Sequence, residues 1–463
     1  MRASKLICAG CGLALPVDQS YPFSCPNAKK GDDIDHVVAR ILDPAQLQFP
    51  DENEKNPFLR YRNLFFSYHL SQAAGITESQ YTDIVKRLNR AIVKVDGHGF
   101  SVTPFGKQDL LGQHLGFSDT GGLWVKDETN NVSGSHKARH FMGIMLYLEV
   151  LKLIKNTQDR PLAVASCGNA ALAAAIVARA GDQKLNVFVP PDADPKVVQR
   201  LKDLGAHLTT CARTPGQKGD PCYLRFKEEL TQETLPFSCQ GSNNGLAIEG
   251  GETLGYELIS QLREENIVLD RVFIQVGGGA LASSCIQALR EGVQLGVLKK
   301  MPKIHSVQTE GASPLARAYD LLAGRIAKTL GARQPTTAHK RAELIGTNTN
   351  STVVQSEIQY AAKHRSEFMW PWEKEPKSIA HGILDDETYD WLEVVKGMIE
   401  SGGYPITAVE PTVRKANDLA RAHTNINVDH TGSSALAGLL QLREQNLLSP
   451  SEKVGLFFTG VRR

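Results

Sequence analysis

The sequence lacks the features that mark membrane proteins, secreted proteins and nucleic-acid-binding proteins. Its 52 basic and 50 acidic residues leave a net charge of +2, and no long run of one sign occurs, so the charge pattern indicates neither a nucleic acid nor a membrane as a partner. The most apolar window, residues 170–179, contains an arginine and is shorter than the roughly 20 residues of a membrane-spanning helix. The first residues also lack the apolar run of a signal peptide.

Cysteine is scarce and unevenly spread. Three of the eight cysteines fall within the first 25 residues, and the other five are scattered at positions 167, 211, 222, 239 and 285. This is not the pattern of a disulfide framework, so it indicates a reducing compartment. We therefore expect a cytoplasmic protein whose partners are small molecules.

Apolar segments of strand length alternate with helical segments along the chain. Three of them run into a glycine-bearing turn that opens an apolar helix, at residues 161–169, 271–279 and 427–434. Further strands are expected at 185–190, 303–309, 405–409 and 455–459. The alternation is typical of an α/β fold with mostly parallel sheets and helices on both faces. With 463 residues, the chain is long enough for two lobes and an appended N-terminal piece.

A lysine stands where a strongly apolar helix is expected to begin. Residues 133–139 read S-G-S-H-K-A-R, and residues 138–154 are apolar almost all round, which predicts a helix buried between layers. The positive end of the helix dipole and the buried surroundings both disfavour a charged amine at Lys137. A neutral amine is a nucleophile, so Lys137 is the candidate catalytic residue.

The three turns and Lys137 are expected to meet, because the carboxyl ends of parallel strands lie at one edge of a sheet. Asn169 offers an amide to a phenolic or carboxylate oxygen, and Thr431 offers a neutral hydroxyl. Backbone N–H groups suited to a phosphate are offered by the run Gly277, Gly278, Gly279 and Ala280. A ligand with a phosphate, a hydroxyl, a ring nitrogen and an aldehyde that captures lysine would use all of these groups, and that ligand is pyridoxal phosphate.

The same segments resemble the motifs of the fold type II pyridoxal-phosphate enzymes, most closely the threonine synthase and threonine dehydratase branch. Residues 126–139, K-D-E-T-N-N-V-S-G-S-H-K-A-R, are similar to the family's lysine motif, commonly E-x-x-N-P-T-G-S-F-K-D-R. The other matches are S-C-G-N-A (166–170) for the asparagine loop, I-E-G-G-E-T-L-G-Y-E-L (248–258) for a helix, V-G-G-G-A-L (276–281) for the phosphate loop and T-G-S-S-A-L-A-G (431–438) for the ring-nitrogen segment. They follow the family order over most of the chain, and jointly they are specific.

The resemblance implies a role for each candidate residue. Lys137 would form the Schiff base, Asn169 would lie beside the cofactor hydroxyl, and Thr431 would face the pyridine nitrogen. The cofactor phosphate would be surrounded by Gly277, Gly278, Gly279 and Ala280. The substrate would be held by Ser133, Ser166 and Gly168. The sequence departs from the family pattern at Val132, His136 and Ala138, so the resemblance does not specify the identity of the substrate.

The resemblance also implies an architecture, that of a two-domain, tryptophan synthase beta-like protein assembling as a homodimer. Residues 41–140 and 245–463 would form the larger, cofactor-binding domain. Residues 141–244 would form the smaller α/β domain, and residues 1–40 an N-terminal knuckle with cysteines.

The implied reaction is a β-elimination on a small, 3-hydroxy amino acid that releases a keto acid and ammonia. The freed amine of Lys137 would remove the α-proton, and a neutral hydroxyl at the ring nitrogen favours elimination or replacement over transamination. A threonine synthase or another replacement enzyme is the alternative, although the sequence shows no set of cations for a substrate phosphate.

Two more distant alternatives stay open. One is a non-catalytic protein that binds pyridoxal phosphate. The other is an NAD-dependent dehydrogenase, because Gly277, Gly279 and Ala282 also fit a G-x-G-x-x-A loop. The acidic residue that such a site needs about 20 positions further on is missing, since Glu310 lies 31 residues beyond Gly279.

The N-terminal cysteines have the spacing of a metal knuckle. Cys8 and Cys11 are separated by two residues, as in sites where two thiolates share one tetrahedral metal ion, and Cys25 follows. A second cysteine near Cys25 is missing, so His36 is the nearest good fourth ligand for zinc. The alternative is a degenerate knuckle whose cysteines are small apolar residues.

One long stretch, residues 346–403, matches no motif. It would be a lid or a substrate-facing insertion, and its His381 is expected to be a surface histidine rather than a substrate contact.

Overall fold

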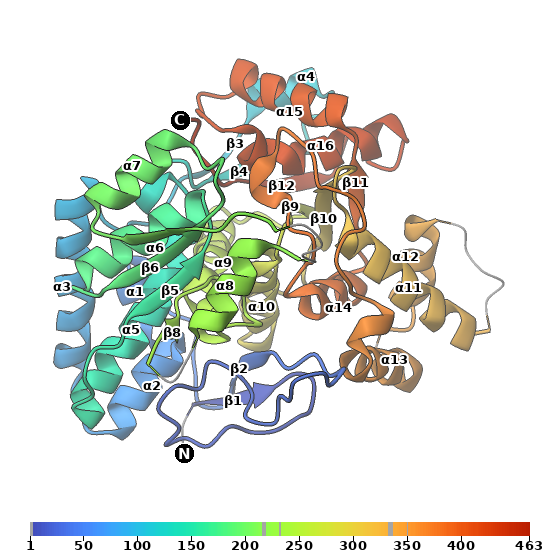
Figure 1. Ribbon diagram of the computed structural model, residues 1–463. Helices are drawn as coiled ribbons and strands as arrows, with labels where there is room; N and C mark the ends of the chain where they lie inside the picture. The colour runs from blue at the N-terminus through green and yellow to red at the C-terminus, as the bar shows by residue number, and fades with distance from the viewer. Residues whose placement is uncertain (1–2, 215–218, 231–232, 332–336, 350) are drawn as a thin grey trace.

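A six-stranded sheet forms the centre of the larger part of the molecule. The computed structural model describes residues 3–214, 219–230, 233–331, 337–349 and 351–463 (Figure 1). The strand order is β11-β10-β9-β12-β4-β3, and only β3 runs antiparallel to its neighbour. The strands are β3 (Phe105–Lys107), β4 (Gly122–Asp127), β9 (Arg271–Gln275), β10 (Lys303–Thr309), β11 (Ile406–Ala408) and β12 (Lys453–Phe458).

A smaller, four-stranded sheet lies to one side of the first (Figure 1). Its order is β7-β6-β5-β8 and all of its pairings are parallel. The strands are β5 (Leu162–Ala165), β6 (Leu185–Val189), β7 (His207–Thr210) and β8 (Leu235–Pro236). All four come from the stretch 141–244 that was predicted as the smaller domain, and the prediction of mostly parallel sheets is confirmed.

The N-terminal residues form a separate antiparallel hairpin of β1 (Ser4–Cys8) and β2 (Val38–Leu42). Figure 1 shows it below the two larger sheets. The helices that follow it are α1 (Pro57–Arg60), α2 (Phe66–Ala73), α3 (Glu78–Asp96) and α4 (Asp109–His114), with a 3₁₀ turn η1 (Arg62–Leu64). A capping box of Thr77 and Gln80 fixes the start of α3, since each side chain accepts from the other residue's backbone N–H.

Buried helices separate the sheets. The lysine-bearing helix α5 (Lys137–Lys155) is buried along most of its length, as its apolar sequence predicts, and it packs on α6 (Asn169–Ala180) and α9 (Leu246–Glu264). Helix α9 also packs on α10 (Ala280–Gln294). The smaller sheet carries in addition α7 (Pro195–Asp203) and α8 (Pro221–Glu229). Each of these two has an aspartate that caps its first turn and a proline as its first residue.

The remaining helices cover the larger sheet and the far end of the molecule. They are α11 (Pro314–Thr329), α12 (Ala338–Gly346), α13 (Thr352–Lys363), α14 (Trp391–Ser401), α15 (Glu410–His423) and α16 (His430–Glu444), with 3₁₀ turns η2 (Val132–Gly134), η3 (Arg365–Glu367) and η4 (His381–Ile383). Helix α16 packs against β9, β10 and β12. These helices and α5, α9 and α10 enclose the apolar core.

One expected strand is absent. The segment 427–434 was predicted to run from a strand into a turn, but Val428 forms only an isolated bridge with Val461, and α16 begins at His430. The reason is local, because the Asp429 carboxylate accepts from the backbone N–H of Gly432 at 2.5 Å and caps the helix. Asp429 therefore has the capping role of an N-cap residue.

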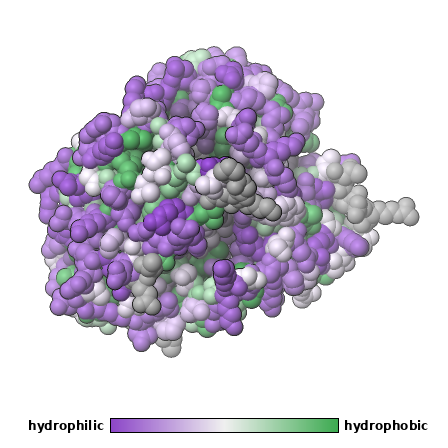
Figure 2. Space-filling model, in the orientation of Figure 1, coloured by the Kyte–Doolittle hydropathy of each residue, from purple (hydrophilic) through white to green (hydrophobic). Residues whose placement is uncertain are grey.

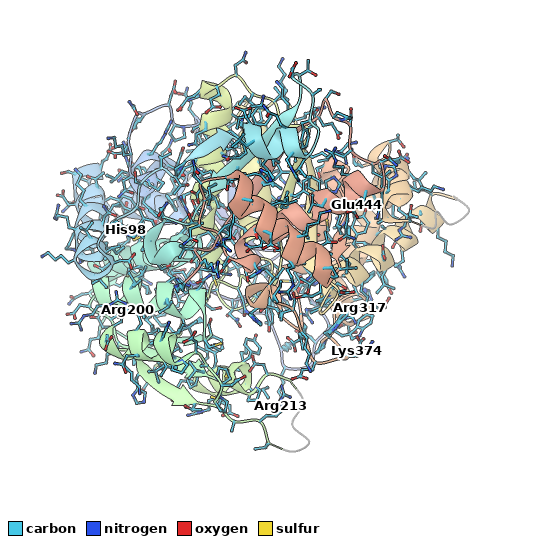
Figure 3. The ribbon with its side chains drawn as sticks, turned by 90° about the horizontal axis from the view of Figure 1, so that it is seen from above. His98, Arg200, Arg213, Arg317, Lys374 and Glu444 are labelled. Carbon is cyan, nitrogen blue, oxygen red and sulfur yellow. The ribbon has the colours of Figure 1, made fainter. Side chains whose placement is uncertain are left out.

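The surface is predominantly hydrophilic on the face shown in Figure 2, with small apolar groups scattered over it. The polar residues His98 and Arg200 are labelled on one side of the molecule in Figure 3, and Glu444 lies on the other half of the view. Within the described ranges, every helix is too short or too polar to cross a membrane.

Candidate active site

Three neighbouring strands of the larger sheet end at the same edge, and the lysine and glycine loops follow two of them. Strand β12 lies between β4, which leads to the lysine loop, and β9, which leads to the glycine loop. The lysine loop is tied to the end of β12, because Glu128 N donates to Phe458 O at 2.7 Å and Val461 N donates to Gly134 O at 2.9 Å. This places the first residues of α5 at the carboxyl edge of the sheet, where parallel sheets bind ligands.

A fully buried network of charges fixes the loop before Lys137. Arg139 donates to Glu128 at 2.8 Å and to Glu257 at 2.7 Å, and Lys126 donates to Glu257 at 2.7 Å. Asn131 donates to the same Glu128 carboxylate at 2.8 Å. Although burial opposes it, the two cations hold the pKa of Glu257 below its usual value. The motif residues that flank Lys137 therefore act as its structural support.

Two neutral histidines lie beside the lysine. His136 and His140 are both buried, and their rings are 5.9 Å apart. Burial and the nearby charge of Lys137 hold the pKa of His136 well below its usual value, and lower that of His140 to about 3. The Nε2 atom of His136 has no hydrogen-bond partner among the described residues. The surroundings of Lys137 are therefore buried and uncharged on this side.

The asparagine loop opens α6 on the smaller sheet. Ser166, Gly168 and Asn169 are all half-buried, and Gly168 N lies 3.4 Å from Ser166 Oγ. A side chain built at Gly168 would meet no described atom within 4 Å, so there is open space in front of this loop. Asn169 Oδ1 faces the lysine loop, because it accepts from Arg463, which also donates to Ser133 O at 2.7 Å. The structure thus brings the predicted substrate and cofactor loops together.

The glycine loop connects β9 to α10 and has no room for side chains. Gly279 has a φ of +101° and caps α10, a conformation that favours glycine. A Cβ atom at Gly277 would overlap the Asp385 carboxylate and lie 2.9 Å from Ile383 Cα. At the helix N-terminus, the backbone N–H groups of Gly278 to Ala280 are of the kind that can bind an anion.

Residues 381–390, here called the covering segment, lie against this loop. Asp390 N donates to Gly278 O at 3.0 Å, and the Thr388 hydroxyl donates to Gly277 O at 3.0 Å. Burial raises the pKa of Asp385 to about 6 and that of Asp390 to about 7, and in each case the charge of Lys137 opposes the shift. The covering segment therefore brings two carboxyl groups close to Lys137. It comes from the stretch 346–403, to which the sequence assigned no motif, and its His381 is exposed.

Thr431 lies in the first turn of α16 and contacts the covering segment. Its hydroxyl oxygen accepts from Gly382 N at 3.0 Å. The turn is joined to the end of β12, because Asp429 N donates to Gly460 O at 2.9 Å. Thr431 is thus near the same sheet edge as Lys137, on the side of the covering segment.

A second threonine hydroxyl, at Thr459, was not singled out from the sequence. Thr459 follows β12 directly, is 2% exposed, and accepts from Gln275 at 2.5 Å. His136 N donates to Thr459 O at 3.4 Å, so this residue adjoins the lysine loop. The T-G pair after the predicted strand 455–459 was the available signal, since the central strand of a parallel sheet ends in the middle of the ligand edge.

The cysteines of the N-terminal hairpin lie together with a histidine. The ligand atoms of Cys8, Cys11, Cys25 and His36 are all within 4.8 Å of one another. Cys8 Sγ is 3.3 Å from His36 Nδ1, and Cys11 Sγ is 3.6 Å from Cys25 Sγ. Burial raises the pKa of the Cys8 thiol to about 12. These are the four residues that the sequence analysis put forward, and their donor set suits a tetrahedral ion.

Arg317 and Lys374 lie on the same side of the molecule in Figure 3, remote from the lysine loop in sequence. The Arg317 guanidinium stands 3.8 Å from the centre of the Trp370 ring. This cation–π contact fixes the part of the stretch 346–403 that precedes the covering segment.

The groups at the sheet edge fit pyridoxal phosphate. The glycine turn offers backbone donors to a phosphate, Asn169 and Thr459 offer polar side chains for the ring substituents, and Lys137 offers its amine at the start of α5. Gln275 Oε1, like His136 Nε2, is buried at this edge without a described hydrogen-bond partner. Buried polar atoms of this kind are usually satisfied by a ligand or water.

Comparison with known proteins gives the same cofactor. The family described as "Pyridoxal-phosphate dependent enzyme" matches residues 98–460. The chain is 24% identical over 360 residues to a threonine synthase of Methanocaldococcus jannaschii, covering 77% of this chain and 74% of that protein. It is 28% identical over 224 residues to an L-serine dehydratase of Saccharomyces cerevisiae, covering 47% and 64%.

The fold is similar to that of solved fold type II enzymes. A threonine deaminase from T.th. superposes with a TM-score of 0.55 at 20% sequence identity, covering 82% of this chain and 98% of that one. An L-serine ammonia-lyase from Rhizomucor miehei has a TM-score of 0.55 at 17% identity, covering 78% and 94%. Since the family match spans most of the sequence, this chain belongs to the pyridoxal-phosphate-dependent enzymes.

Proposed function

We propose that the protein is a lyase that acts on a small 3-hydroxy amino acid and releases a keto acid and ammonia by β-elimination. The observation that carries the proposal is the placement of Lys137 at the start of a buried helix, facing the edge where the asparagine loop, the glycine loop and two threonine hydroxyls converge. The relatives named serine dehydratase and threonine dehydratase support the same reaction class.

Each part of the site has a task in this reaction. Ser133 of the lysine loop and Ser166 and Gly168 of the asparagine loop hold the substrate carboxylate, with open space in front of Gly168. Bound pyridoxal phosphate supplies an electron sink for the bond that breaks at the α-carbon. The Lys137 amine takes the α-proton, and the two neutral histidines beside it add no competing charge.

The ring nitrogen of the cofactor would face a neutral hydroxyl. Thr431 is the residue that the sequence motif points to, and Thr459 is the one that the position of β12 favours. Neither hydroxyl holds a ring nitrogen protonated as an ionised carboxylate does, and this favours elimination or replacement over transamination.

The test is a panel of amino acids assayed for keto acid and ammonia. L-serine, L-threonine or a 3-hydroxy relative should yield both products, and Lys137→Ala should abolish the yield. Lys155→Ala, at the other end of α5, is the matched control. Turnover that needs a phosphorylated substrate and an added nucleophile would overturn the elimination.

A threonine synthase or another replacement enzyme is the second candidate. It is favoured by the longer matches, because the relatives named threonine synthase align over 77% of the chain, against 47% for the serine dehydratase. Formation of threonine and inorganic phosphate from a phosphorylated homoserine would establish it. The dehydrogenase interpretation of the glycine loop is not carried further, because the loop lies within the match to the pyridoxal-phosphate family.

Zinc at the N-terminal hairpin is a separate part of the proposal. Cys8, Cys11, Cys25 and His36 would bind one ion and add a second tie to the hairpin of β1 and β2. Metal analysis should find one zinc per chain in the purified protein and none in Cys8→Ser. Cys211→Ser, whose thiol lies in the smaller domain, should keep the metal. A wild-type protein without metal would leave the cluster a degenerate knuckle.

The cytoplasmic location, the homodimer and the division into domains at residues 40, 140 and 244 belong to the same proposal. Light scattering of the purified protein should give twice the mass of 50.6 kDa. Residues 40 and 140 lie inside β2 and the buried helix α5, so limited proteolysis should cut first in exposed loops rather than at these two positions.

A further inference from the structure

Arg463 reaches from the end of the described chain into the candidate site. Its backbone neighbours are fixed, because Val461 N donates to Gly134 O at 2.9 Å and Arg462 N donates to Asn427 O at 3.0 Å. The guanidinium donates to Ser133 O at 2.7 Å and to the side chain of Asn169. It therefore lies between the lysine loop of the larger domain and the asparagine loop of the smaller one.

The charge of this guanidinium is only partly offset by the protein, because Asp429 and Asp96 act on it from beyond ion-pair distance. Both of its acceptors are neutral carbonyl oxygens, and no carboxylate of the described residues lies within 4.0 Å of it. Arg139, in contrast, is balanced by two buried carboxylates at 2.8 and 2.7 Å. An arginine held by neutral groups at a ligand site is ready to pair with an anion, and its planar fork suits a carboxylate or a phosphate.

The position of Arg463 identifies which anion this would be. The α-carboxylate of an amino acid already has partners in the proposed site, in Ser133, Ser166 and the half-buried loop around Gly168, and Arg463 contacts only the backbone oxygen of Ser133. The cofactor phosphate has the glycine turn, on the other side of Lys137 and next to the covering segment. A second anionic group on the substrate is the remaining negative charge at this place.

We infer that Arg463 is a specificity-determining residue, and that the substrate is an amino acid whose side chain carries an anionic group, a carboxylate or a phosphate. The inference rests on the proposed function, since it names the substrate class of the same site. It also supplies a cation for which the sequence offered no candidate. In the free protein the guanidinium uses Ser133 and Asn169, and on binding the anion replaces these weaker neutral partners.

The reaction keeps its balance with either anion. From 3-hydroxyaspartate the β-hydroxyl leaves as water, and hydrolysis takes up one water and gives a keto diacid and ammonia. From O-phosphoserine the phosphate leaves as inorganic phosphate, and hydrolysis of the remaining enamine takes up one water and gives a keto acid and ammonia. Comparison of the two substrates therefore shows whether Arg463 binds a carboxylate or a phosphate.

The test compares these two substrates with L-serine and L-threonine in the wild-type enzyme, Arg463→Gln and Arg462→Gln. The neighbouring Arg462 is exposed and makes only backbone hydrogen bonds, so its variant removes one charge at the next position and serves as the matched control. Arg463→Gln should lower kcat/KM for the anionic substrate by about 30-fold to 100-fold, the loss typical of a charged hydrogen bond. The same variant should change kcat/KM for the neutral substrates by less than about 3-fold. Arg462→Gln should have the kcat/KM values of the wild type, and Arg463→Lys should recover part of the loss.

A binding measurement separates this inference from the proposed function. L-aspartate has a side-chain carboxylate and no β leaving group, so titration calorimetry should show that it binds more tightly than L-alanine, and that Arg463→Gln removes the difference. Equal effects of the Arg463 and Arg462 variants on every ligand would overturn the inference while leaving the lyase in place. Failure of every amino acid to react, with aspartate still bound through Arg463, would overturn the lyase and keep the anion site.

Discussion

The buried charge network next to Lys137 gives the sharpest energetic prediction, for the substitution Glu257→Gln. Lys126, Arg139, Glu128 and Glu257 are two cations and two anions whose side chains are 0% exposed, so the network is neutral as a whole. The Glu257 carboxylate accepts from Lys126, from Arg139 and from Thr103 N at 2.9 Å. The amide would keep one accepting oxygen, place an NH₂ group against a cation, and leave one positive charge uncompensated.

Breaking one partner of a buried ion pair costs about 3 to 5 kcal/mol, because the remaining charge stays buried without a counter-charge. We expect Glu257→Gln to lower the free energy of unfolding by this amount, a large share of the roughly 5 to 15 kcal/mol of a typical domain. Urea unfolding of the two proteins at equal cofactor concentration measures it. Arg139 is two residues from Lys137, so the same variant should also lose catalytic activity.

The pH dependence of the stability difference between the wild type and Glu257→Gln checks the same prediction. The folded-state pKa of Glu257 lies below its unfolded value, so its contribution to stability is present above the unfolded pKa and is lost as the pH falls through the folded pKa. The wild-type protein should lose its advantage over Glu257→Gln on acidification. The double variant Lys126→Met/Glu257→Leu, which removes both charges of one pair, should be more stable than Glu257→Gln. A loss under about 1 kcal/mol for Glu257→Gln, with no change in its pH profile, would refute the reasoning.

Three further predictions address the site itself. Gly277→Ala should lose the cofactor, because its Cβ atom would overlap the covering segment. The control Gly324→Ala in α11 has open space around its Cβ atom and should retain the cofactor. Equal cofactor absorbance in the two variants would contradict this packing. Asp385→Asn should raise the free energy of unfolding at about pH 8 and change it little at about pH 4. The reason is that the pKa of Asp385 is raised in the folded protein, so ionisation of its carboxyl costs stability above the unfolded pKa. A gain in stability that does not depend on pH would argue against this. Thr459→Val should lower kcat more than Thr431→Val if Thr459 faces the ring nitrogen, and the reverse order would return that role to Thr431.

Much of the site follows from local sequence patterns. The strands at 185–190, 303–309 and 455–459 were predicted because each is a short apolar run bounded by turn residues. Parallel pairing in the larger sheet carried the lysine and glycine loops to one edge, whereas the asparagine loop follows a strand of the smaller sheet. The buried helix after Lys137 followed from its nearly continuous apolar sequence. These features depend on periodicity and on residues that lie close together in the chain.

The features that the sequence did not reveal depend on contacts between distant segments. The covering segment reaches the glycine loop over more than 100 residues of chain, and the Arg463 guanidinium meets Asn169 across 294 residues. The segment before α16 was wrongly expected to be a strand, because Val428 is apolar and the capping role of Asp429 competes with extension. Thr459 was overlooked because its position in the middle of the sheet follows from the strand order, and that order cannot be read from a single sequence.

The most direct test of the account is to identify the residue that binds the cofactor. The protein would be incubated with pyridoxal phosphate, reduced with borohydride, digested and examined by mass spectrometry. The account predicts one pyridoxyl-modified peptide, with the label on Lys137, and a Lys137→Ala protein that shows neither the label nor the visible absorbance of the bound cofactor. A label on another lysine, or a Lys137→Ala protein that keeps both signals, would contradict it.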